Sequence, residues 1–336
     1  MTRSLRVLLC LAVLASCAFG QTTLNGAGAT FPYPIYSKWF SEYHTLHPDI
    51  QINYQSIGSG GGIRQVQAGT VDFGASDGPM TDEQIAQAKV KVLHVPTVLG
   101  AVVPAYNVPG ISADLKFTPD VLADIYLGKI AQWSDPRIAK VNPGVKFPDQ
   151  SITVVHRSDG SGTTYIFTDY LSKVSSDWKN MVGKGTSVKW PVGIGGKGNE
   201  GVAGTVRQLP GSIGYIELIY ALQNKIPFGA VENSSHNFIK ASLQSTTLAA
   251  QGVKMPADFR VSITNPAGKE AYPIASFTWL LIPTNPVDAN KGKILKDFLF
   301  WMIDKGQTMV EALSYAPLPS DVVQKEKAAI QSQVKP

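Results

Sequence analysis

Two patterns of apolar residues alternate along the chain. In some stretches apolar positions recur every three or four residues, which predicts amphipathic helices, and in others they form short alternating or continuous runs, which predicts strands. The predicted helices cover 35–47, 120–127, 163–174, a stretch around Phe298 and a terminal segment after Ser320. The predicted strands cover 50–57, 71–75, 152–156, 212–216 and 277–282. Alternation of the two kinds of element indicates an α/β fold.

Local residue signals refine the ends of these elements. Thr81 and Gln84 have the spacing of a capping box, which predicts that a helix begins there. Ser320 has the residue type that favours a helix N-cap, so we expect it to cap the terminal helix. The extended run 90–107 is interrupted by Pro96 and Pro104, and we expect those prolines to break it.

Two extended passages suggest that the chain leaves one lobe and later returns to it. The first is 90–107, and the second begins at Ala271. We therefore expect lobe I to comprise residues 21–99 and 271–336, and lobe II to comprise 100–270. Each lobe would have a central sheet flanked by helices, and two crossings would form a hinge. A cleft between two such lobes is the default place for a ligand.

The first 20 residues have the features of a secretory leader. A basic start with Arg3 and Arg6 precedes the apolar run 7–15, which is too short to span a bilayer. Two cleavage schemes remain open. Residues 14–17 resemble a lipoprotein box that would leave a lipid on Cys17, whereas residues 18–20 would suit an ordinary signal peptidase. Either scheme predicts export to the periplasm or the outer face of the cell envelope.

Composition excludes several classes of function. The formal net charge is +5, and two of these charges belong to Arg3 and Arg6, so the body lacks the basic patch of a nucleic-acid-binding protein. Both cysteines, Cys10 and Cys17, fall in the leader, which leaves the folded body without a disulfide or thiol chemistry. The five histidines have no metal-ligand spacing, so we expect neither a metal nor a cofactor.

Small hydroxyl residues and glycines recur where a loop leads into a predicted helix or closes a strand. They lie at 26–32, 59–62, 76–77 and 157–163. A helix N-terminus offers free N–H donors and a positive dipole end, and glycine lets the backbone come close to a ligand. Together they favour a small oxyanion. Each segment alone is also explained by a tight turn with an ordinary cap. None has the Gly-Lys-Ser/Thr ending of a P-loop, so nucleotide hydrolysis is not expected.

Six segments, taken in order, resemble the phosphate-binding proteins of ABC phosphate importers. They are 26–32, 54–62, 71–77, 152–171, 211–217 and 271–279, and the resemblance runs from about Leu24 to the C-terminus. It implies a periplasmic-binding-protein fold of type II, a phosphate ligand, and the importer's permease and ATPase as partners. It also implies a set of phosphate-binding residues: Thr30, Phe31 through its backbone N–H, Ser59, Asp77, Arg157, Ser161, Gly162 and Thr163.

The chemistry of Asp77 favours phosphate over sulfate. A carboxylate beside an anion repels it unless the anion carries a proton to donate, and near neutral pH phosphate does so whereas sulfate does not. Sites that require such a hydrogen bond reject analogues lacking it by roughly 10⁴–10⁵. The alternative is that Asp77 merely caps the segment after it.

Arg157 would supply a charged donor pair to the anion. Asp159, two residues further on, would pair with the guanidinium and fix its plane, a role that the resemblance also implies. The alternative for this pair is a surface ion pair of little energetic value.

Two other functions are alternatives to phosphate import: an exported phosphatase, and a binding protein that acts as a sensor or an adhesin. Against the first, no serine has an evident partnering base in its segment.

Overall fold

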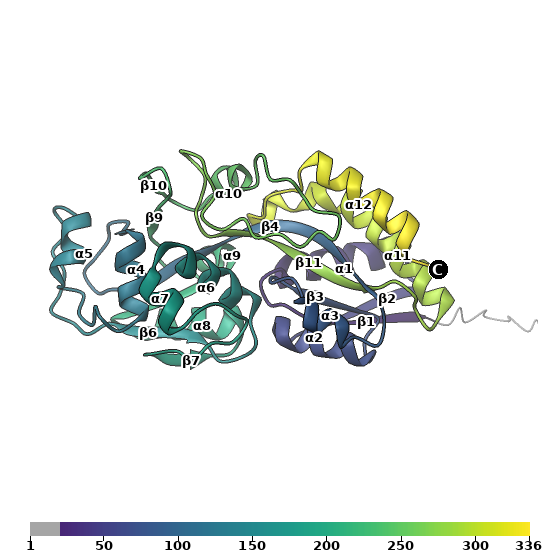
Figure 1. Cartoon of the computed structure of the whole chain (residues 1–336), viewed down its shortest axis with the longest axis horizontal. Helices are drawn as coiled ribbons and strands as arrows, with labels where there is room; N and C mark the ends of the chain where they lie inside the picture. Colours follow the sequence, from purple (N-terminus) through teal and green to yellow (C-terminus); the bar gives the residue numbers. More distant parts are fainter. Residues whose placement is uncertain (1–20) are drawn as a thin grey trace, which may run out of the picture.

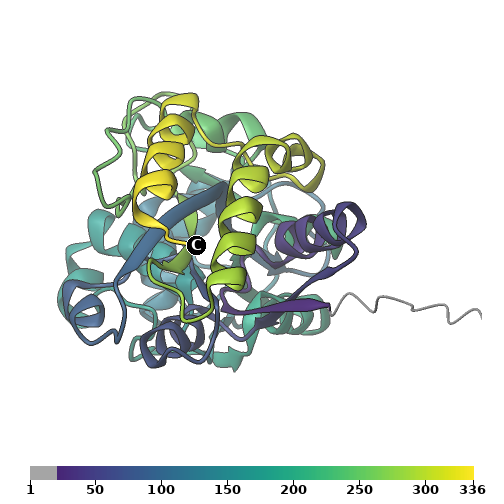
Figure 2. The ribbon, with the colours of Figure 1, turned by 90° about the vertical axis from the view of Figure 1, so that its right-hand side faces the viewer.

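The computed structural model describes residues 21–336, so the predicted leader and Cys17 lie outside the described residues. One lobe, here lobe I, is built from the first elements of the chain (Figure 1): β1 (Thr22–Gly28), α1 (Tyr33–Leu46), β2 (Ile50–Ser56), α2 (Ser59–Ala68), β3 (Phe73–Ser76) and α3 (Asp82–Ala86). It is completed by the last ones: β11 (Ala275–Pro283), α11 (Ala289–Asp304), two short 3₁₀ turns (Gly306–Met309 and Glu311–Leu313) and α12 (Ser320–Gln333). Figure 2 shows α11 and α12 side by side on one face of this lobe.

The other lobe, lobe II, is formed by the middle of the chain. Its elements are β5 (Lys116–Phe117), α4 (Pro119–Tyr126), α5 (Pro136–Val141), β6 (Thr153–Arg157), α6 (Gly162–Val174), α7 (Ser176–Met181), β7 (Ile194–Gly196), α8 (Gly198–Gln208), β8 (Ser212–Glu217), α9 (Leu218–Gln223), β9 (Ala230–Glu232) and β10 (Phe238–Ile239). α10 (Leu243–Ala249) lies above the junction of the lobes in Figure 1. The predicted helices and strands are therefore present, within a few residues of their expected ends. The expected lobe boundaries at 99/100 and 270/271 stay a prediction.

One long strand, β4 (Val92–Asn107), joins the two lobes (Figure 1). It pairs antiparallel with β11 along one part and with β8 along another, so a single eight-stranded sheet runs through both lobes in the order β2-β1-β3-β11-β4-β8-β6-β7. A small second sheet has the order β10-β9-β5. β4 is buried along nearly its whole length, as expected of a strand covered on both faces.

The expectation that Pro96 and Pro104 break the run 90–107 is wrong, because β4 continues through both. Pro96 pairs with Trp279 and Val98 with Thr278, which makes Thr97 the extra residue of a β-bulge. A bulge is a place where a strand tolerates a residue without an N–H. Pro104 pairs with Tyr215, and its carbonyl oxygen accepts a hydrogen bond of 3.0 Å from the Gly229 N–H.

The terminal helix also differs from expectation. α12 begins at Ser320, but Pro319 is its N-cap and no side chain caps it. Ser320 is thus the first helical residue and not the cap, because the first backbone bond of the helix already goes from the Val323 N–H to the Pro319 carbonyl. The capping box of Thr81 and Gln84 at the start of α3 is confirmed.

Residues 255–264 also connect the two lobes, and we call this segment the strap. On the lobe I side, Arg260 donates to the Met80 carbonyl at 3.0 Å and pairs with Asp82 at 2.7 Å. On the lobe II side, Ser262 and Thr264 each donate to the buried Asp169 carboxylate of α6 at 2.6 Å. The strap therefore ties the segment that follows β3 to the helix α6 across the junction.

Among the described residues, no helix combines the length and the apolar character needed to cross a bilayer.

Candidate anion-binding site

In lobe I, three turns bring polar groups to the junction with lobe II. Thr30 and Phe31 connect β1 to α1, Ser59 is the first residue of α2, and Asp77 follows the end of β3. β1 lies between β2 and β3 and is parallel to both, so the carboxyl ends of these strands meet at one edge of the sheet. In such sheets this edge is where ligands bind.

In lobe II, β6 ends at Arg157 and the chain turns into α6. Ser161 is the N-cap of α6, and its hydroxyl accepts a hydrogen bond of 3.0 Å from the Thr164 N–H. Phe167 of α6 stacks on Tyr215 of β8 with ring centroids 4.6 Å apart. The Tyr215 hydroxyl in turn accepts from the Arg157 N–H at 3.0 Å and bonds the Thr164 hydroxyl at 2.6 Å. The core of lobe II therefore fixes the start of α6 relative to Arg157.

The glycine segments of the two lobes touch each other directly. The Gly60 N–H donates to the Gly160 carbonyl at 2.9 Å, and the Gly162 N–H donates to the Ser59 hydroxyl at 3.0 Å. Gly58 has a φ of +87°, and a Cβ there would lie 2.3 Å from an Asp159 carboxylate oxygen. Glycine at 58 is therefore required both by the backbone conformation and by the close approach of the lobes.

Three buried hydroxyls at this junction each accept two hydrogen bonds. Thr30 Oγ1 accepts from the backbone N–H and the side-chain amide of Asn199, at 3.2 and 2.8 Å. Ser59 Oγ accepts from the N–H groups of Asp77 and Gly162, at 3.2 and 3.0 Å. Thr163 Oγ1 accepts from Arg157 and Asn199, at 3.3 and 3.1 Å. Since a hydroxyl oxygen has two lone pairs, each O–H is left to act as a donor.

Asp77 is the acidic member of this group, and its side chain is 1% exposed. Its Oδ1 accepts a hydrogen bond of 2.8 Å from the Thr278 hydroxyl on β11. Burial raises the pKa of Asp77 to about 7, although the Thr278 hydrogen bond and the charge of Arg157 oppose the rise. At neutral pH this carboxyl is thus poised between its two protonation states.

Arg157 and Asp159 form a buried ion pair. Arg157 Nε donates to Asp159 Oδ1 at 2.8 Å and Nη2 donates to Oδ2 at 2.5 Å, while Oδ1 also accepts from the Gly198 N–H at 3.0 Å. Burial opposes the charge of Asp159, but the hydrogen bonds and charge of Arg157 outweigh it and hold the pKa of Asp159 below its usual value. The pair is not the exposed surface pair of the alternative, because the Arg157 side chain is only 1% exposed.

The structure thus brings together the residues singled out from the sequence, with two differences of detail. The Ser161 hydroxyl is engaged as the cap of α6, so what it offers beyond that cap is its one O–H. The Gly162 N–H already donates to the Ser59 hydroxyl at 3.0 Å, so it is engaged in the contact between the lobes. In agreement with the expected use of Phe31 through its N–H, the backbone N–H groups of Phe31 and Thr163 make no hydrogen bond to another residue within 21–336. Whether these groups hold phosphate stays a proposal.

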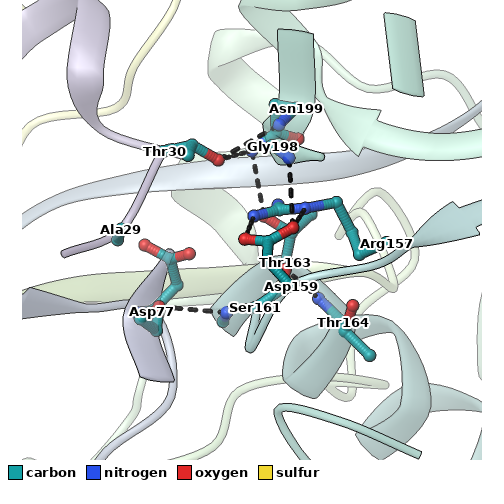
Figure 3. A network of polar contacts seen from close by, with 12 residues as sticks. Ala29, Thr30, Asp77, Arg157, Asp159, Ser161, Thr163, Thr164, Gly198 and Asn199 are labelled. Atoms are coloured by element: carbon teal, nitrogen blue, oxygen red, sulfur yellow. Dashed lines mark hydrogen bonds and ion pairs between the residues drawn. The ribbon is translucent and has the colours of Figure 1, made fainter. Parts of the chain in front are cut away.

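Two residues of the cluster were missed by the sequence analysis. Asn199, at the start of α8, contacts Thr30 and Thr163, and Thr278 of β11 contacts Asp77 (Figure 3 shows Asn199 above Arg157). The segment 195–199 is not among the four segments singled out from the sequence. The sequence feature that could have revealed it is the polar Asn199 directly after a glycine at a strand-to-helix turn, the same design as in the other segments.

Among the described residues, no three or more His, Cys, Asp or Glu side chains lie together in a group that could hold a metal ion.

Comparison with known proteins agrees with this architecture. The model of the PBP superfamily domain matches residues 15–305. The phosphate-binding protein PstS of Xylella fastidiosa (strain Temecula1) is 46% identical over 93% of this chain and 86% of its own length. The PstS protein of Pasteurella multocida is also 46% identical, over 93% of this chain and 91% of its own.

Among solved structures, a human phosphate binding apolipoprotein superposes with a TM-score of 0.74 over 91% of this chain and 94% of its own, at 21% identity. That likeness shows the fold, which is the periplasmic-binding-protein fold expected from the sequence. The two relatives of 46% identity show more than the fold, because they match nearly the whole chain. This protein belongs to the family of PstS phosphate-binding proteins within the PBP superfamily.

Proposed function

We propose that this protein binds inorganic phosphate outside the cytoplasm and delivers it to the permease and ATPase subunits of an ABC importer. Its family membership supports the ligand, and the cluster at the lobe junction supplies chemistry that suits it. The proposed phosphate contacts are those expected from the sequence: Thr30, Phe31, Ser59, Asp77, Arg157, Ser161, Gly162 and Thr163, with Asp159 holding Arg157 in place.

The observation that carries the proposal is a buried carboxyl surrounded by hydrogen-bond donors. The hydroxyls of Thr30, Ser59 and Thr163 each have their proton left to donate, and Arg157 adds a charged donor. Such donors suit the unprotonated oxygens of an anion. Asp77 is the one acceptor among them, and it suits an oxygen that carries a proton. Monohydrogen phosphate presents both kinds of oxygen, whereas sulfate presents only the first.

We expect binding and release without turnover. In the described part of the chain, the hydrogen bonds to the Ser59 and Thr163 hydroxyls come from backbone N–H groups, an amide and a guanidinium. All of these donate, so none is a base that could take a proton from the hydroxyl to make a nucleophile. Sustained hydrolysis of a phosphate monoester by the pure protein, lost on Thr163→Val, would favour the phosphatase rival instead.

The location follows from the leader and the family. We propose that the leader exports the protein and that any membrane anchor is a lipid on Cys17, attached through the few residues that precede β1 at Thr22. A single acyl chain binds a membrane only marginally, so a stable anchor needs more than one chain.

Uptake of labelled phosphate tests delivery as distinct from binding. Host cells in which the gene for this protein is deleted should lose high-affinity uptake, and the wild-type gene should restore it. Arg157→Ala should not restore uptake, whereas Arg137→Ala, in an ion-pair cluster on the surface of lobe II, should. If the purified protein binds phosphate but deletion leaves uptake unchanged, import is excluded and a sensing or adhesive role takes its place.

A further inference from the structure

Asn199 is a buried amide that reaches both lobes (Figure 3). It is the second residue of α8 and is 0% exposed. Its Nδ2 donates to Thr30 Oγ1 of lobe I at 2.8 Å and to Thr163 Oγ1 of lobe II at 3.1 Å. Its backbone N–H also donates to Thr30 Oγ1, at 3.2 Å. Both hydrogen bonds accepted by Thr30 Oγ1 therefore come from this one residue.

The orientation of the amide is determined by its other end. Asn199 Oδ1 accepts a hydrogen bond of 2.9 Å from the Glu217 N–H at the end of β8. A peptide N–H can only donate, so the atom that faces it must be the amide oxygen. The NH₂ group must then face the two threonine hydroxyls, and it cannot accept from either of them.

This orientation determines the direction of the threonine O–H groups. When the lone pairs of a hydroxyl oxygen are occupied by donors, its proton is the only group left for a ligand. We propose that Asn199 is a positioning residue that holds Thr30 and Thr163 as hydrogen-bond donors and so restricts the oxygens facing them to unprotonated ones. The protonated oxygen of the ligand is thereby directed to Asp77. The inference rests on the proposed function and deepens it.

The same geometry couples ligand binding to the contact between the lobes. The two hydroxyls that share the Asn199 amide belong to different lobes, so both are held as donors only while the lobes are together. Opening of the junction separates Thr30 from Asn199 and frees its hydroxyl to turn and accept. The site then loses a fixed donor at the moment when the ligand has to leave.

A double-mutant cycle separates this role from a purely structural one. Phosphate affinity is measured by calorimetry for the wild type, Asn199→Ala, Thr30→Val and the double variant. If Asn199 acts through the Thr30 hydroxyl, Asn199→Ala should weaken phosphate binding about tenfold in the wild type but only about two- to threefold when that hydroxyl is already absent. An equal loss in both backgrounds, or no loss in either, would overturn the proposal.

Two further variants guard against a folding defect. Asn199→Asp keeps the acceptor for the Glu217 N–H and nearly the same shape, but it replaces the NH₂ donor with an acceptor. This variant should fold, and it should bind phosphate more weakly than Asn199→Ala does. The new carboxylate would accept the O–H groups of Thr30 and Thr163, which could then no longer donate to phosphate, and its negative charge would repel the anion. An affinity equal to that of the wild type would contradict the proposal.

The matched control is Asn142→Ala, which removes another buried amide of lobe II that donates to the Lys116 and Ile138 carbonyls. It should lower thermal stability without changing phosphate affinity. If the wild type itself fails to bind phosphate, the proposed function fails, and this result is distinct from any outcome of the cycle.

Discussion

The Thr278 hydroxyl donates a hydrogen bond of 2.8 Å to Oδ1 of Asp77, and both side chains are buried. Thr278 lies on β11, and its own carbonyl accepts from the Thr97 hydroxyl of β4 at 3.2 Å. The carboxyl is therefore held by β11 of lobe I, which is itself bonded here to β4, the strand that joins the lobes. The bond occupies one oxygen of Asp77 and leaves the other to accept a proton from a ligand.

Removal of this hydrogen bond should change the titration of Asp77. The Thr278 hydroxyl lowers the pKa of Asp77 against the larger effect of burial, so Thr278→Val should raise that pKa further. The pH above which sulfate binding weakens should therefore move upward, and phosphate affinity should fall several-fold. Calorimetric titration with sulfate across pH gives the profile. Thr278→Ser, which keeps the hydroxyl, should behave as the wild type, and a profile unchanged in Thr278→Val would contradict this role.

Ionisation of the buried Asp77 carboxyl should destabilise the ligand-free protein at alkaline pH. Its folded-state pKa of about 7 lies above the usual value of 3.8 for an aspartate, so the folded state keeps a proton that the unfolded chain releases between these values. The free energy of unfolding should then fall as pH rises through this window. Asp77→Asn should be more stable than the wild type at pH 8, by at most about 4 kcal/mol at ~1.4 kcal/mol per pKa unit. Urea unfolding without phosphate at about pH 4 and pH 8 measures this, and an identical pH dependence of the two proteins would contradict it.

Much of the cluster could be predicted because each of its turns is local. The start of α6 is an example, since the hydroxyl of Ser161, the flexibility of Gly162 and the apolar period after Thr163 all indicate a helix N-terminus there. β4 shows the limit of such rules, because its tolerance of Pro96 depends on a bulge against β11, whose Trp279 lies 183 residues further along the chain. Local rules contain no information about that partner strand.

Asn199 was missed for a related reason. α8 contains Gly198, Gly201 and Gly204, and glycine disfavours a helix interior by about 1 kcal/mol relative to alanine. The buried residues Val202, Ala203 and Val206 have helical spacing, but the three glycines weaken the helical signal. Packing against β8 and β6 then makes the segment a helix in the structure. At Gly201, the Gly196 backbone lies 3.3 Å from where a Cβ would be, so a small residue there also allows close packing. The strap was missed because its anchors, Asp82 and Asp169, lie far from it in sequence.

The strap should favour the closed arrangement of the lobes. Arg260→Ala removes the links to Met80 and Asp82, so the ligand-free protein should be more open than the wild type. Because these contacts are partly exposed, the effect should be modest, with phosphate released about three- to tenfold faster. Small-angle scattering with and without phosphate, together with stopped-flow release, measures both quantities. Arg137→Ala is the control, since its ion pairs lie within lobe II. A radius of gyration that saturating phosphate leaves unchanged in the wild type would mean that closure has no part in handover.

The mature N-terminus should show which cleavage takes place. Lipoprotein processing would give a chain that begins at a lipid-modified Cys17, and ordinary cleavage would give a free N-terminus at Gln21. Mass spectrometry of the protein from its native host distinguishes the two by the mass of the first peptide. An uncleaved Met1 would contradict export by this leader.

Calorimetric titration of the purified protein with phosphate and sulfate between pH 6 and pH 9 tests the central claim most directly. Sulfate binding requires a proton on Asp77, so above pH about 7 its affinity should fall roughly tenfold per pH unit, whereas monohydrogen phosphate brings its own proton and should lose far less. At pH 8 the titration of Asp77 alone supplies about tenfold of this preference, and the charge-assisted hydrogen bond from the proton of the phosphate to the Asp77 carboxylate should raise it to at least about a thousandfold. Asp77→Asn, whose amide can donate to either anion, should bind sulfate more tightly and remove the pH dependence of the ratio. Equal affinities for the two anions at pH 8, or a ratio that does not change with pH in the wild type, would contradict the account.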